Sequence, residues 1–248
     1  MDAISLYDQT TLECSKLITQ RYSTSFTLGI KTLAKKFHLP IYAIYGFVRY
    51  ADEIVDTFHD QDKKALLDRF KKDTYEAIEA KISLNPVLHA FQLIVNQYKI
   101  DLDLIEAFLH SMEMDLDFKT YNDSKYNEYI YGSAEVVGLM CLNAFLLGHK
   151  VTKKDRDKMV AGARALGSAF QKVNFLRDLS ADSNQLGRSY FPGVFPGALT
   201  EDRKTAIVED IRSELAISAS TLPLLPKESR RAVVAAHTLF EALNNKIG

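Results

Sequence analysis

The chain has 248 residues, of which 47% are hydrophobic and 25% are charged, and its net charge at pH 7 is -1. This composition is ordinary for a globular protein, and the balanced charge gives no basis for binding nucleic acid or an acidic membrane. Cys14 and Cys141 form neither a disulfide framework nor a metal-binding spacing, so they fit a reducing compartment.

The first ten residues lack the basic and apolar regions of a signal peptide. The most apolar segment, residues 134–148, carries Glu135 and Asn143 and is too short by itself to cross a bilayer. We therefore expect a cytoplasmic protein, and peripheral contact with a membrane stays open.

Helical periodicity runs through the chain, and strand alternation is scarce. This pattern predicts one all-α domain spanning residues 1–248, with helix boundaries known to about three residues. The predicted helices are 9–21, 24–35, 40–58, 61–81, 86–98, 101–117, 124–149, 152–181, 201–220 and 226–245. The longest irregular stretch, residues 183–200, fits a functional loop and an ordinary surface connection equally well.

The helix at 40–58 carries a polar stripe formed by Tyr45, Arg49, Asp52 and Asp56, which fall within roughly 60° of one another. Two aspartates one turn apart repel each other, and burial raises the cost of that repulsion unless cations offset it. A single pair of this kind is more often a solvated helix face than a ligand pair.

The helix at 152–181 repeats the pattern near its end. Asp178 and Asp182 are again four residues apart, and Gln171 and Asn174 extend the stripe. Four facing carboxylates would need divalent cations, and all-oxygen ligation suits Mg²⁺ or Mn²⁺. Mg²⁺ commonly bridges to phosphate oxygens, so two such half-sites suggest a diphosphate held between them. The six histidines have no zinc-ligand spacing.

Four segments resemble motifs of the squalene/phytoene synthase family, and the match as a whole covers most of the chain. The four segments are YSTSFTLGI at 22–30, AIYGFVRYADEIVD at 43–56, YIYGSAEVVGLM at 129–140 and QKVNFLRDLSADSNQLGRSYFP at 171–192. The resemblance implies a single-domain isoprenoid-synthase bundle with a central cavity. The amino-acid sequence around residues 129–140 is most similar to that of bacterial phytoene synthases.

The resemblance also implies roles for individual residues. The implied Mg²⁺ ligands are Asp52, Asp56, Asn174, Asp178 and Asp182, and Arg49 and Tyr129 join the four aspartates as catalytic residues. The implied substrate contacts are Ser23, Ser25, Tyr45, Arg49, Gln171, Arg177 and Tyr190. Taken without the resemblance, serines here are more often helix caps and tyrosines more often packing residues.

Two features depart from the family pattern. Ser133-Ala134-Glu135 stands where relatives commonly have Val-Ala-Gly, and the chain ends some tens of residues before relatives do. A third acidic cluster, Glu113, Asp115 and Asp117, is left out of the metal set because a solvated face is at least as good an interpretation.

The expected function is Mg²⁺-dependent condensation of two geranylgeranyl diphosphates, through a cyclopropylcarbinyl diphosphate, to phytoene. No GxGxxG fingerprint follows a strand, and we expect no NADPH requirement. The alternatives are a C15-specific relative making dehydrosqualene, a presqualene-type product or squalene; a terpene cyclase; and a non-catalytic scaffold protein. The expected partners are prenyl diphosphates and not nucleic acid, and the sequence does not predict the oligomeric state.

Overall fold

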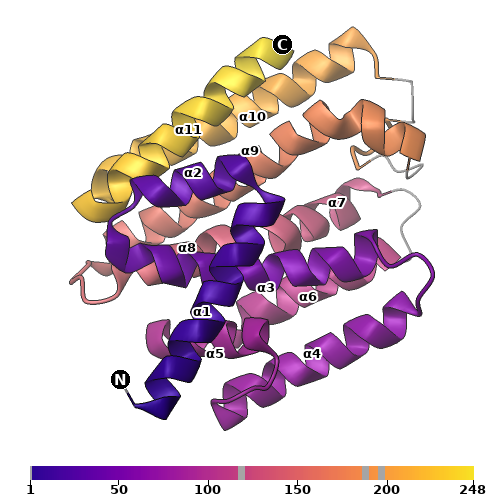
Figure 1. Cartoon of the computed structure of the whole chain (residues 1–248). Coiled ribbons are helices and arrows are strands. Elements are labelled where there is room, and N and C mark those ends of the chain that lie inside the picture. Colours follow the sequence, from indigo (N-terminus) through magenta and orange to yellow (C-terminus); the bar gives the residue numbers. More distant parts are fainter. Residues whose placement is uncertain (1, 117–120, 186–189, 195–198) are drawn as a thin grey trace.

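The computed structural model describes residues 2–116, 121–185, 190–194 and 199–248, with side chains described outside residues 179–185. Within these residues every regular element is helical (Figure 1). The first half comprises α1 (Ala3–Tyr22), α2 (Thr24–Thr32), η1 (Lys35–Phe37), α3 (His38–Asp56), α4 (Lys63–Ala80), α5 (Pro86–Tyr98) and α6 (Leu102–Leu116). The second half comprises α7 (Asp123–Ile130), η2 (Tyr131–Glu135), α8 (Val136–Leu146), α9 (Lys153–Gln185), α10 (Glu201–Thr221), η3 (Leu222–Leu224) and α11 (Lys227–Ile247).

The predicted all-α fold is confirmed, and the helix boundaries differ at a few places. Helix α1 begins at Ala3, six residues before the predicted start, because the Asp2 side chain accepts a hydrogen bond from the Ser5 N–H at 2.8 Å and caps the helix. The predicted helix at 124–149 is interrupted by η2, a π-helical turn in which the Val136 N–H bonds to the Tyr131 carbonyl. Helix α9 continues to Gln185, into the predicted irregular stretch.

The helices stack in an order that separates the two acidic helices. From top to bottom in Figure 1, α10, α9, α8, α3 and α4 follow one another, and each packs against the next. Helix α8 therefore lies between α3 and α9. In the same view α3 and α9 both run toward the right-hand end of the molecule, so their acidic C-terminal turns lie at that end.

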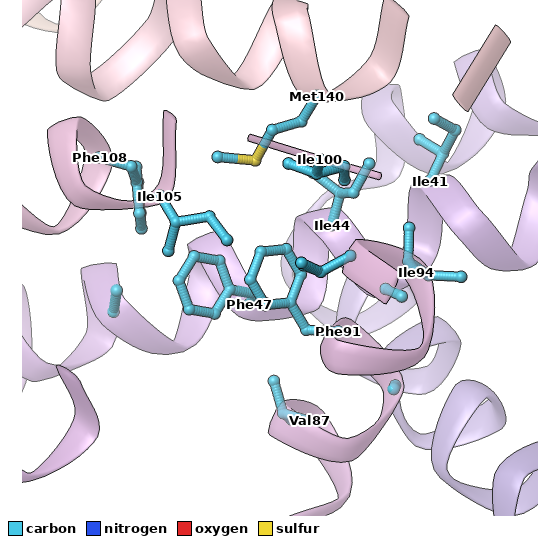
Figure 2. Close-up of a cluster of buried hydrophobic side chains, with 14 of the residues drawn as sticks. Ile41, Ile44, Phe47, Val87, Phe91, Ile94, Ile100, Ile105, Phe108 and Met140 are labelled. Carbon is cyan, nitrogen blue, oxygen red and sulfur yellow. The ribbon is translucent and has the colours of Figure 1, made fainter. Parts of the chain in front are cut away.

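The main core lies where α3, α5 and α6 meet. Phe47 and Phe91 stack face to face with ring centroids 3.8 Å apart, and Phe108 packs against Phe47 at 5.4 Å (Figure 2). Ile105 and Met140, also fully buried, belong to the same cluster. Burial of these large side chains supplies much of the hydrophobic stabilisation and fixes the position of α3.

Glycines allow α9 to approach the π-turn and α8 closely. A Cβ added at Gly167 would lie 2.6 Å from the Ala134 carbonyl oxygen, and one at Gly138 would lie 2.7 Å from the Ala163 carbonyl oxygen. Real Cβ atoms do not come this close to backbone oxygen, so only glycine fits at these two crossings.

The apolar segment at residues 134–148 is part of a longer helical stretch. Together α7, the π-turn and α8 make 24 helical residues, Asp123–Leu146, long and apolar enough to cross a membrane by length and composition alone. Half of its most apolar window is buried inside the protein, and a core helix passes the same test.

Candidate active site

The acidic pair of α3 lies at the end of a helix whose other face is buried in the core. Asp52 is half-buried, whereas Asp56, the last residue of α3, is exposed. Burial raises the pKa of Asp52 to about 7, repulsion from Asp56 adds to the shift, and attraction to Arg49 opposes it. The two carboxylates thus repel each other where a cation would bind, and their oxygen donors fit Mg²⁺ or Mn²⁺.

Arg49 is held by groups that the sequence does not single out. Its guanidinium forms an ion pair with Glu53, one turn along α3, and lies over the Tyr22 ring at 4.6 Å. Its Nε is buried without a hydrogen-bond partner. The predicted contact of Arg49 with a diphosphate stays a prediction, because Glu53 holds the side chain here.

Ser23 and Tyr45 come together beside this pair. The Ser23 side chain partly offsets the rise that burial causes in the pKa of Tyr45, and the Tyr45 ring stacks on Phe26 at 4.5 Å. The Ser23 Oγ also accepts a hydrogen bond from the Phe26 N–H at 3.2 Å and caps α2. Ser23 is therefore both a helix cap and a neighbour of the α3 stripe. Ser25 is exposed in the first turn of α2.

The α9 stripe separates from the core face as predicted. Val173 and Leu176 are buried, whereas Gln171, Asn174 and Asp178 are half-buried. Arg177 is exposed and makes two hydrogen bonds to Asp178, Nε to Oδ1 at 2.8 Å and Nη2 to Oδ2 at 2.6 Å. Asp182 is in the helical part of α9, but its side chain lies outside the described residues.

Tyr129 and Tyr190 meet in a buried aromatic cluster. Tyr190 stacks on Phe175 at 4.1 Å with the rings 2° apart, and Tyr129 lies 5.4 Å from Tyr190. The Tyr129 hydroxyl donates a hydrogen bond to the Asp115 Oδ2 at 2.9 Å. Burial raises the pKa of Tyr129 well above its ordinary value, and the Asp115 charge raises it further, so the phenol stays protonated at neutral pH.

Asp115 contacts a predicted site residue, Tyr129, although it does not belong to the residues predicted from the sequence. It is only 4% exposed. Glu113, two residues earlier, instead forms a half-buried ion pair with Lys71 at 3.3 Å, and Asp117 lies outside the described residues. The helical period could have separated Asp115 from Glu113, because Asp115 shares a face with the buried Ser111 and Met112.

The predicted residues thus form three groups, around Asp52, around Asp178 and around Tyr129. In the described part of the chain, no three His, Cys, Asp or Glu side chains lie close enough together to hold a metal ion. Two of the hollows on the described surface, of about 500 and 380 Å³, are lined by other residues than the predicted site residues. Glu135, the acidic residue in the segment that differs from the family pattern, forms an ion pair with Arg164 of α9 at 2.5 Å.

The comparisons with known proteins agree on a family. A model described as squalene/phytoene synthase matches residues 19–194. Phytoene synthase from Arthrospira platensis is 30% identical over 188 residues, covering 73% of this chain and 60% of the relative. Phytoene synthase 1 from Zea mays is 29% identical over 185 residues, covering 71% of this chain and 42% of the relative. The chain thus spans only about two-fifths to three-fifths of the length of these two relatives.

Solved structures share the fold over nearly the whole chain. A dehydrosqualene synthase solved with a ligand superposes with a TM-score of 0.82 and 26% identity, covering 97% of this chain and 86% of the other. A squalene synthase from Alicyclobacillus acidocaldarius superposes with a TM-score of 0.84 and 19% identity, covering 98% and 94%.

Proposed function

Since the chain belongs to the squalene/phytoene synthase family, we propose that it condenses two geranylgeranyl diphosphates head to head to give phytoene. The observation that carries the proposal is the pair of acidic half-sites. Asp52 and Asp56 end α3, Asp178 lies near the end of α9, and both helices run to the same end of the molecule (Figure 1).

The acidic residues are proposed to hold the metal through Asp52, Asp56, Asn174, Asp178 and Asp182. When bound, Mg²⁺ would supply positive charge to the leaving diphosphate. The remaining diphosphate oxygens would be met by Arg177 and by Arg49, which would have to exchange part of its contact with Glu53. Ser23 and Tyr45, which lie near each other beside Arg49, would add neutral donors.

The prenyl chains are proposed to lie among the half-buried apolar side chains that α3, α8, α9 and α11 present, such as Val48, Val137, Phe170 and Val233. An apolar surround excludes the water that would quench an allylic cation. The protonated Tyr129 would act through its ring and its hydrogen bond to Asp115 rather than as a base, because its raised pKa keeps the hydroxyl neutral. Aromatic faces also stabilise a nearby cation.

A second candidate keeps the chemistry and changes the substrate. The similarity to a dehydrosqualene synthase at 26% identity favours a C15 enzyme that condenses farnesyl diphosphate. The cytoplasm remains the proposed location, and no NADPH is expected for either phytoene or dehydrosqualene.

A product assay tests the proposal. The protein is incubated with Mg²⁺ and either geranylgeranyl or farnesyl diphosphate, with and without NADPH, and the hydrocarbon is identified by mass spectrometry. A C40 product without NADPH supports phytoene synthase, and a C30 product moves the function to the C15 branch. A cyclised monomeric product would indicate a terpene cyclase. No product from either substrate, together with no binding of Mg²⁺ and pyrophosphate, would favour a scaffold protein.

A further inference from the structure

A buried lysine joins α9 to α10 on the side of α9 away from the predicted ligands. The Lys172 side chain is 9% exposed, and its Nζ lies 2.6 Å from the Asp210 Oδ2 and 2.8 Å from the Glu214 Oε1. The Ser168 Oγ donates a further hydrogen bond to the Glu214 Oε1 at 2.6 Å. The cluster therefore ties two positions on α9, four residues apart, to two on α10.

The charges in this cluster depend on one another. Burial works to lower the pKa of Lys172, but Glu214 and Asp210 outweigh it, so the pKa lies above its ordinary value and the lysine stays charged. The same two carboxylates add to the burial that raises the pKa of Tyr126, which places α7 beside the cluster. Removing the Lys172 charge would leave the Glu214 carboxylate, whose side chain is 19% exposed, without its ion-pair partner, which is costly.

Lys172 and the predicted site residues of the α9 stripe lie on different sides of that helix. At about 100° per residue, Gln171, Asn174 and Asp178 each lie roughly 100–160° around α9 from Lys172. The apolar contacts on the α10 side, made by Ala169, Val173 and Leu176, are non-directional and tolerate small rotations. The Lys172 ion pairs oppose such rotations more strongly, because a rotation would move Nζ away from the two carboxylates and leave the buried ammonium and the Glu214 carboxylate poorly paired.

A small rotation of α9 would displace the side chains on its far side by a distance that is large for catalysis. Side chains extend about 5–6 Å from a helix axis, so turning α9 by about 10° moves a carboxylate on the far side by about 1 Å. A displacement of about 1 Å in a positioning group can cost about 100-fold in rate.

We infer that Lys172 is a positioning residue, whose ion pairs with α10 set the rotation of α9 and so aim Asn174 and Asp178 at the metal-bound diphosphate. The inference rests on the proposed function, because it needs a diphosphate at the α9 stripe. It assigns to Lys172 no contact with the substrate.

The test measures binding of inorganic pyrophosphate in the presence of Mg²⁺ by calorimetry, which does not depend on turnover. Lys172→Met is expected to weaken this binding by about 10- to 100-fold. Glu214→Gln keeps a neutral acceptor for both Lys172 and Ser168, so it should fold and weaken binding in the same direction by a smaller factor. Thermal melting gives the stability of each variant.

A matched control distinguishes an effect on the positioning of the α9 side chains from an effect on the stability of the fold. Asp8 lies 2.7 Å from the buried His89 and joins α1 to α5, away from the predicted site. Asp8→Ala should lower the melting temperature and leave pyrophosphate affinity unchanged. If Lys172→Met and Glu214→Gln bind pyrophosphate as tightly as the unaltered chain, the inference is wrong and Lys172 contributes only to stability. If Lys172→Met does not fold, the pyrophosphate affinity of Glu214→Gln tests the inference by the same criterion. An unaltered chain that binds no pyrophosphate with Mg²⁺ would instead overturn the proposed function and this inference with it.

Discussion

The close crossing of α9 and the π-turn makes Gly167 a sensitive position. A Cβ there would lie 2.6 Å from the Ala134 carbonyl oxygen, 3.0 Å from the Ala134 carbonyl carbon and 3.2 Å from the Glu135 Cα. All three are backbone atoms, so no side chain can turn away to make room. Ordinary contact begins at 3.4 Å, so Gly167→Ala must separate the two helices by about 0.8 Å.

The expected cost follows from two opposing effects. Overpacking costs about 1–3 kcal/mol, and a clash with backbone belongs at the upper end of that range. Alanine gains about 1 kcal/mol over glycine in a helix, which leaves a net loss of about 2 kcal/mol. For a chain of this size the melting temperature should fall by about 4–8 °C.

Gly29→Ala is the matched control in α2. A Cβ at Gly29 meets no heavy atom within 4 Å, so this substitution gains helix propensity without a clash. Its melting temperature should rise by about 2–4 °C. Both variants are measured by thermal unfolding followed by circular dichroism. A melting temperature for Gly167→Ala that equals or exceeds that of the unaltered chain would show that the helices do not cross so closely.

Three further outcomes concern the proposed chemistry. Asp52→Asn or Asp178→Asn should reduce turnover at least about 100-fold in the product assay. Asp52→Asn should not lower the melting temperature, because it removes a partly buried charge that Asp56 repels. Retained activity in either variant would contradict the metal assignment. EDTA should abolish turnover and added Mg²⁺ or Mn²⁺ should restore it, and a rate indifferent to chelation would contradict the metal requirement. Tyr129→Phe removes the hydrogen bond to Asp115 and should cost about 2 kcal/mol, or about 4–8 °C, whereas an unchanged melting temperature would mean that the bond contributes nothing.

Helical period explains which parts of the site the sequence could predict. Residues that share a face are fixed by their spacing, so the spacing alone separates the half-buried Asn174 from the buried Val173. The same spacing puts Tyr45, Arg49 and Asp52 on one side of α3, where the charges of Arg49 and Asp52 both affect the pKa of Tyr45.

Contacts between helices could not be predicted in this way. Periodicity does not say which neighbour a face will meet, so the sequence gives no sign that Asp115 of α6 accepts a hydrogen bond from Tyr129. Arg49 had several acids within reach, and the choice of Glu53 depends on side-chain geometry. The early start of α1 depends on the Asp2 cap, a single local hydrogen bond outside the apolar period.

The π-helical turn between α7 and α8 also matters for how relatives are aligned. Its bond from the Val136 N–H to the Tyr131 carbonyl spans five residues instead of four, so the turn holds one residue more than an α-helix would. In a regular helix an inserted residue would rotate everything after it by about 100°. A π-turn can take up one extra residue without that rotation, which would keep Tyr129 and the α8 face in their directions. A one-residue gap against a relative should therefore be placed within residues 131–135, and deleting a residue there should leave the flanking helices facing as they do now.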